Sequence, residues 1–206
     1  MGHMSTDSKP SPLPLTERQE ARRRRILEAS TRLACGGGFD AVQMREVAES
    51  SGVALGTLYR YFPSKIHLLV SVLARDLETT SQRLVKSPPA GDTPAERVLL
   101  VLGRTTRALQ REPDLTEALT RAYMFADASA SAEIRQVGVQ VTRLLLTGLR
   151  EPGDPRGFEG PTPDELAVIR MLGDVWLASL VQWVTGRTST TDVKSSIETA
   201  VRLLLR

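Results

Sequence analysis

Side chains suited to binding a nucleic acid gather in one short stretch near the N-terminus. Thr57 and Tyr59 carry hydroxyl groups and Lys65 carries an ammonium group, and all three suit the oxygens of a phosphate backbone. Gln43 and Arg45 can form hydrogen bonds with the edges of bases, and an arginine guanidinium matches guanine. These residue types point to the recognition of phosphates and bases.

Groups that carry out covalent or metal-assisted catalysis are scarce by comparison. The chain has one cysteine and two histidines, and His3 lies in an opening Gly-His-Met that resembles the remnant of a cleaved tag. One histidine and one cysteine cannot supply a structural zinc site. The triple glycine at 36–38 lacks the following lysine of a phosphate-binding loop. We therefore predict no enzyme activity, no catalytic residues, no metal and no cofactor.

The elements that would position the nucleic-acid-binding side chains have the pattern of a helix-turn-helix. Ala48 is small enough for two helices to touch, and Gly52, four residues later, tolerates the left-handed backbone of a tight turn. The second helix of such a unit lies in the major groove of DNA. Leu55 at its start could touch a thymine methyl group, and Gly56 would let the backbone approach closely.

The remaining pattern is helical throughout. Leu, Ala and Arg are abundant and aromatic residues make up only 4% of the chain, which favours helices over sheets. Thr16 with Gln19 predicts the start of a first helix, which Gly36–Gly38 would end, and Ser64 predicts the start of a long fourth helix. Apolar spacing predicts helices at 43–50, 55–61, 94–111, 115–125, 132–149, 163–184 and 191–205. The predicted fold class is all-α.

We divide the chain into three parts on these patterns. Residues 1–15 are polar, contain three prolines and include the tag remnant, so we expect a disordered arm. Residues 16–63 would form a three-helix, helix-turn-helix head. Residues 64–206 would form a larger helical body for ligand binding and dimerisation.

Charge is distributed unevenly along the chain. Residues 1–86 hold 13 Lys and Arg against 9 Asp and Glu, whereas the rest holds 14 against 15. The basic excess near the predicted head suits a polyanionic partner. The run Arg22–Arg25 would form a solvated face, or Arg22 or Arg25 would contact the DNA backbone. No apolar stretch approaches 18 residues and no signal peptide is visible, so we expect a cytoplasmic protein without a membrane partner.

The run from Gly52 to Lys65, GVALGTLYRYFPSK, closely resembles the signature GVxxGTLYxYFxSK of the TetR family of transcriptional regulators. The resemblance implies a homodimer that binds double-stranded operator DNA with an inverted repeat. It also implies a pocket for a small molecule inside the body. Ala54 departs from the Ser or Thr that often caps the recognition helix, and Val42-Gln43 replaces a common Thr/Ser pair, which puts particular phosphate contacts in doubt.

The predicted body helix at 163–184 is apolar on two sides, so one face can serve the protomer's own core and the other a partner subunit. The resemblance implies that the last two helices join the dimer in a four-helix bundle. Large apolar residues are the candidates for the walls of the pocket: Leu102, Met124, Phe125, Leu145, Trp176 and Leu180. For each of these residues, simple core packing is the competing interpretation.

The predicted function is that of a ligand-responsive transcriptional repressor. The amino-acid sequence of the head also resembles that of the actinobacterial repressors of cholesterol catabolism within the family. This resemblance implies release from the operator by a steroid CoA thioester. The alternatives are a TetR-type repressor that responds to a fatty acyl-CoA or to a hydrophobic, drug-like effector. A purely architectural DNA binder would not explain a body twice the size of the head.

Overall fold

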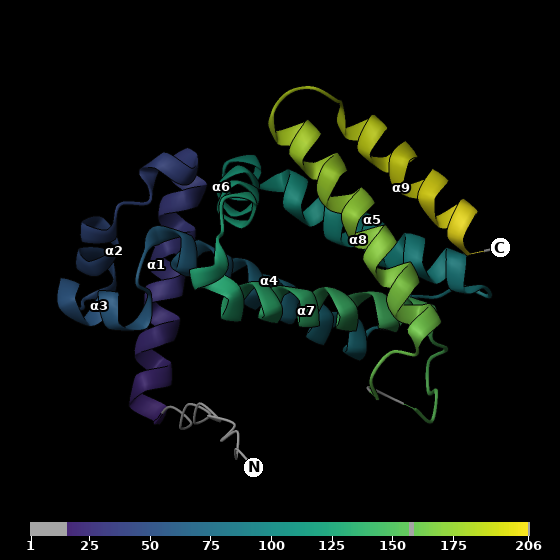
Figure 1. Ribbon diagram of the computed structural model, residues 1–206, viewed down its shortest axis with the longest axis horizontal. Helices are drawn as coiled ribbons and strands as arrows, with labels where there is room; N and C mark the ends of the chain where they lie inside the picture. Colours follow the sequence, from purple (N-terminus) through teal and green to yellow (C-terminus); the bar gives the residue numbers. More distant parts are fainter. Residues whose placement is uncertain (1–15, 157–158, 206) are drawn as a thin grey trace, which may run out of the picture.

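The computed structural model describes residues 16–156 and 159–205, and within these ranges the chain is helical with no strand, which confirms the all-α prediction (Figure 1). The helices are α1 (Glu17–Ala41), α2 (Met44–Ser51), α3 (Leu55–Tyr61), α4 (Lys65–Lys86), α5 (Pro94–Arg111), α6 (Pro113–Met124), a 3-10 turn (Ala128–Ala130), α7 (Ser131–Leu149), α8 (Pro163–Val184) and α9 (Thr190–Leu204). The arm predicted at residues 1–15 lies outside the described residues.

The predicted start of the first helix is confirmed by its hydrogen bonds. The Thr16 hydroxyl accepts from the Gln19 backbone N–H at 3.4 Å, and the Gln19 side chain accepts from the Thr16 N–H at 2.7 Å. The predicted end is only partly right. Regular geometry breaks at Gly37 and Gly38, and the chain then adds a further helical turn up to Ala41. Gly38 has φ +65°, a conformation that glycine adopts without strain.

The helices form a head and a body that share one continuous apolar core. In Figure 1 the head, made of α1, α2 and α3, lies on the left, and α4 leads from it into the body. Within the body, α4 packs along α7, α5 packs on α7 and α9, and α8 packs along α9. Helix α6 stands between the head and the body, because it contacts α1 on one side and α4 and α8 on the other.

Helix α8 is the one helix in the described ranges that is long and apolar enough to cross a membrane by length and composition. Only 28% of its apolar window is buried within the protomer. Its inner face carries the buried residues Ile169, Leu172 and Trp176, whereas Met171 on the opposite side is 53% exposed. This division matches the two apolar faces predicted from the sequence and leaves one of them uncovered in the monomer.

Candidate DNA-binding head and effector cavity

Helices α2 and α3 pack as the sequence predicts. Val47, Ala48 and Leu58 are buried between the helices of the head, and Gly52 takes a left-handed conformation with φ +66°. Ser51 stands at a position where an apolar residue is usual, and its hydroxyl donates to the Val47 carbonyl at 2.6 Å. This bond satisfies the buried hydroxyl, so serine fits the interior of the motif.

The predicted DNA-binding residues of α2 and α3 lie mostly at the surface of the head. Arg45 and Gly56 are exposed, Tyr59 is 45% exposed, and Leu55 and Thr57 are half-buried. The Thr57 hydroxyl accepts from the exposed guanidinium of Arg60 at 3.3 Å. Gln43, which directly precedes α2, is exposed, and its amide donates to the Asp40 carbonyl at 3.0 Å. The helix-turn-helix therefore presents hydroxyl, amide and cationic groups together.

Lys65 occupies a different environment from the one expected for a simple phosphate ligand. Its ammonium group donates to the Phe39 carbonyl at 3.0 Å and lies 4.1 Å from the centre of the Phe39 ring. Burial lowers the pKa of Lys65. These contacts fix the corner between α1 and α2, and two of the three ammonium hydrogens remain for a phosphate.

A second set of contacts ties the same corner to α6, and sequence reasoning did not foresee it. The Glu117 carboxylate accepts from the Phe39 backbone N–H at 3.0 Å. The Arg121 guanidinium lies 4.5 Å from the centre of the Phe39 ring and 3.4 Å from the Asp40 carboxylate. The four-residue spacing of Glu117 and Arg121 places both on one face of α6, but only the fold reveals what that face contacts. We call these four residues the corner clamp.

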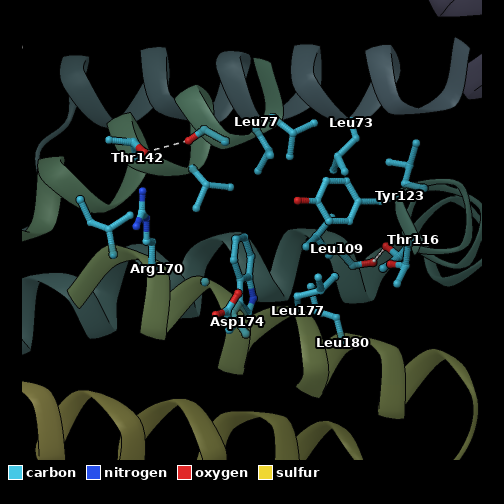
Figure 2. A pocket seen from close by; sticks show the side chains of 18 of the residues that line it. Leu73, Leu77, Leu109, Thr116, Tyr123, Thr142, Arg170, Asp174, Leu177 and Leu180 are labelled. Carbon is cyan, nitrogen blue, oxygen red and sulfur yellow. Dashed lines mark hydrogen bonds between the residues drawn. The ribbon is translucent and has the colours of Figure 1, made fainter. Parts of the chain in front are cut away.

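The opposite face of α6 lines a cavity of about 330 Å³ inside the body (Figure 2). Its walls are mainly apolar and come from five helices: Leu73 and Leu77 of α4, Leu109 of α5, Leu119 of α6, Val137 and Val141 of α7, and Ile169, Trp176, Leu177 and Leu180 of α8. The Trp176 indole N–H donates to the Thr106 hydroxyl at 3.0 Å, which fixes the orientation of this large side chain. The cavity therefore has the apolar, preformed character of a small-molecule site.

Most polar groups of this cavity lie at its two ends. Figure 2 shows Arg170 and Thr142 at one end, Tyr123 and Thr116 at the other, and the carboxylate of Asp174 between them. The Thr142 hydroxyl donates to the Gly138 carbonyl at 2.8 Å, and the Thr116 hydroxyl donates to the Leu109 carbonyl at 2.7 Å. The Tyr123 hydroxyl points into the cavity (Figure 2), and Arg170 is exposed at the surface.

Two of the six predicted pocket residues, Trp176 and Leu180, line the cavity, and the other four do not. Leu102 and Leu145 are fully buried in the core, outside the cavity lining. Met124 and Phe125 are 55% and 72% exposed and lie outside the lining of this cavity. Because Tyr123 turns toward the cavity, the next two residues point about 100° and 200° away from it.

The outer faces of α8 and α9 form a further groove that includes Met171, Val175, Ala200, Leu203 and Leu204. Leu203 is 55% exposed, and Met171 is similarly uncovered. Asp192, Ser195, Ser196 and Thr199 of α9 also line the groove. Exposed apolar side chains bordered by polar residues are typical of interaction surfaces. The groove lies on the helices that the sequence predicts for dimerisation.

Comparison with known proteins agrees with this architecture. Residues 26–72 match the family described as bacterial regulatory proteins, tetR family, and residues 91–204 match the tetracyclin repressor-like, C-terminal domain. The chain belongs to the TetR family. It is therefore a DNA-binding transcriptional repressor by family, as the signature string predicts. The first match spans the helix-turn-helix, and the second spans both outer helices and the cavity lining except Leu73 and Leu77 of α4.

Three similar proteins show how far the likeness extends. The HTH-type transcriptional repressor KstR of Rhodococcus jostii is 54% identical over 187 residues, which cover 91% of this chain and 84% of the relative. The crystal structure of a TetR transcriptional regulator from Rhodococcus sp. RHA1 has a TM-score of 0.82 at 36% identity, covering 92% and 98% of the two chains. Thermus thermophilus FadR, solved with lauroyl-CoA, shares the fold with a TM-score of 0.66 at 23% identity, covering 88% and 92%.

Proposed function

We propose that this TetR-family repressor controls genes of sterol degradation and leaves its operator when a steroid CoA thioester occupies the body. The observation that carries the proposal is the cavity, whose mainly apolar walls suit a sterol skeleton and whose lining at one end includes Arg170, which is exposed to solvent. A CoA group is polyanionic and must stay near water beside cations. The 54% identity to a KstR repressor supports the same assignment.

The DNA-binding surface that we propose comprises Gln43, Arg45, Leu55, Gly56, Thr57, Tyr59 and Lys65. Arg45 and Gln43 would reach base edges or phosphates, and Tyr59, Thr57 and Lys65 would hold phosphates. Two heads in a dimer would read two halves of an inverted repeat. The centres of the half-sites would lie about 34 Å apart, or a multiple of this distance.

Helix α6 would connect the effector to the operator, because it lines the cavity with Tyr123 and holds the head through Glu117 and Arg121. A ligand that moves α6 would carry the corner of α1 and α2 with it and change the spacing of the two heads. The ligand shifts DNA affinity only as far as it binds the two head positions differently.

The deciding experiment titrates a preformed protein–operator complex with a 3-oxo-cholestenoyl-type CoA thioester, with its free acid and with palmitoyl-CoA. Release by the steroid thioester at low micromolar concentration, without release by palmitoyl-CoA, supports the proposal. Release by palmitoyl-CoA alone would favour the acyl-CoA alternative, which the lauroyl-CoA complex of Thermus FadR suggests. Release by neither would overturn both while leaving the family assignment intact.

A cavity-filling variant tests whether release depends on this cavity. A Cβ at Gly173 would lie 3.7 Å from Val141, an ordinary contact, so Gly173→Leu can fold while its side chain fills the cavity. It should bind the operator normally and need at least about tenfold more thioester for release. The matched control is Gly103→Leu on α5, outside the cavity lining. Equal sensitivity of the two variants would place the ligand elsewhere.

We also propose that α8 and α9 form the dimer interface. Val175→Glu would bury a charge in an apolar interface without a partner, which costs several kcal/mol. Light scattering at micromolar concentration should then report a monomer, whereas the control Val85→Glu, at an exposed valine of α4, should remain a dimer. A wild-type monomer under these conditions would refute the interface.

A further inference from the structure

A second cavity lies on the far side of α4 and α7 from the effector cavity, where α1 crosses these helices, and it has a volume of about 860 Å³. Leu73 and Leu77 of α4 face the effector cavity, whereas Ala74 and Glu78, about a third of a turn further round the helix, face the second one. Five arginines line it: Arg23 and Arg24 of α1, Arg75 of α4, and Arg135 and Arg143 of α7. We call it the arginine groove.

The positive charge of the arginine groove is only partly matched by carboxylates. Glu20 and Glu78 are the acidic residues among the side chains that line it, against five arginines. Two of these arginines have carboxylate partners outside the lining, because Arg24 lies 3.9 Å from Glu28 and Arg75 lies 3.0 Å from Asp76. The guanidinium groups of Arg135 and Arg143 make no ion pair or hydrogen bond within the part of the chain that the structure describes. Like charges held close together repel one another and raise the local concentration of anions.

Arg23 shows the mismatch most clearly. It is half-buried, its guanidinium lies 5.5 Å from the centre of the Phe62 ring, and no carboxylate of the described residues lies within 4 Å. Burial lowers its pKa, and the charge of Arg75 acts in the same direction, partly offset by Glu133 and Glu78. A guanidinium removed from water without an anionic partner is costly, so a bound anion would stabilise this arrangement.

Two buried polar atoms beside Arg143 also lack partners. The Ser81 hydroxyl oxygen and the Gln140 carbonyl oxygen are buried without a hydrogen-bond partner among the described residues. Both line a shallower extension of the groove, about 470 Å³, to which Lys86 adds another cation. Ser81 is 6% exposed, so water satisfies its hydroxyl poorly. A ligand oxygen in the extension could accept from that hydroxyl.

We propose that the arginine groove binds a small phosphate-bearing anion of the pyrophosphate or nucleoside diphosphate class. A guanidinium donates two parallel hydrogen bonds to a phosphate, and several arginines together favour a multiply charged group over a single carboxylate. The volume suits a small molecule. No aromatic side chain lines the groove in the described residues, so affinity comes from the phosphates rather than from stacking on a base. The site bridges the head, through α1, and the body, through α4 and α7.

The test is a calorimetric titration of the full-length protein with inorganic pyrophosphate, without DNA. We expect saturable binding at one site per protomer that weakens as salt rises. The double variant Arg135→Gln/Arg143→Gln should weaken binding at least about tenfold, since these exposed side chains have no partners to lose in the described fold. The control Arg104→Gln, an exposed arginine of α5, should bind like the wild type. Circular dichroism confirms that each variant is folded.

A comparison of ADP with pyrophosphate distinguishes a site for a nucleotide from a site for the phosphates alone. ADP binding much more tightly than pyrophosphate identifies a nucleotide, and equal binding identifies the phosphates alone; both support the site. No saturable binding, or an equal loss in Arg104→Gln, would overturn the proposal. Operator binding that weakens in the double variant, together with no binding of pyrophosphate, would assign the groove to the DNA backbone and overturn it as well. These outcomes do not depend on which effector enters the other cavity.

Discussion

Replacing Glu117 with alanine should loosen the head from the body. The variant removes the acceptor for the Phe39 backbone N–H, 3.0 Å away, and one partner of Arg121, 3.6 Å away. A hydrogen bond to a charged acceptor contributes about 1.5–3 kcal/mol. The partly exposed ion pair with Arg121 adds only about 0.2–1 kcal/mol. We therefore expect a loss of about 2 kcal/mol, which for a chain of this size lowers Tm by about 4–8 °C.

Two measurements at fixed protein concentration check this expectation. Thermal denaturation gives the change in Tm, and hydrogen exchange at the Phe39 amide reports the clamp directly, with exchange faster by about one to two orders of magnitude. Glu117→Gln is the matched control, because its amide oxygen can still accept from the same N–H. This variant should retain at least half of the free energy of stabilisation that Glu117 contributes. If Glu117→Ala melted like the wild type and the Phe39 amide exchanged no faster, the corner clamp would contribute nothing to stability. Its proposed role in coupling the effector cavity to the head would then be refuted.

Three further predictions concern DNA affinity, packing and pH. Tyr59→Phe should weaken binding to operator and unrelated duplexes alike, because a phosphate contact carries no base information; loss at the operator alone, measured by fluorescence anisotropy, would contradict it. Gly148→Ala should destabilise the fold by about 1–2 kcal/mol, since its Cβ would lie 2.9 Å from the Val98 backbone, whereas Gly138→Ala, with open space at its Cβ, should raise Tm. The Arg150 guanidinium holds the pKa of Glu165 at about 2, so the carboxylate's contribution is complete above the unfolded pKa of about 4.3 and is lost as pH falls toward 2. The difference in Tm between the wild type and Glu165→Gln should therefore shrink over that range, and a constant difference would contradict the assignment.

The helices and the head could be predicted because their signals are local. Capping residues such as Thr16 and Ser64, the left-handed turn at Gly52 and the spacing of apolar residues act within a few positions of one another. Helix α6 begins at Pro113, two residues before the predicted start at 115, because a proline fits the first turn of a helix although it would break the interior of one.

The cavity and the corner clamp could not be predicted from local sequence signals. The sequence pattern of an apolar residue on a helix is the same whether its side chain packs in the core, as that of Leu145 does, or lines a cavity, as that of Leu180 does. Likewise, nothing near Lys65 in the sequence indicates the Phe39 carbonyl, 26 residues earlier, to which it donates. These properties depend on how helices distant in the chain are packed.

The shared core through α4 has a consequence for how such a protein can be divided. Leu68 near the start of α4 and Leu84 near its end belong to the same apolar cluster as Leu58 of the head and Leu102 of the body. A cut between head and body would expose an apolar face on both pieces, so the two parts should melt in a single cooperative transition. A head with new operator specificity could then be transplanted only together with the matching surfaces of α4 and α6.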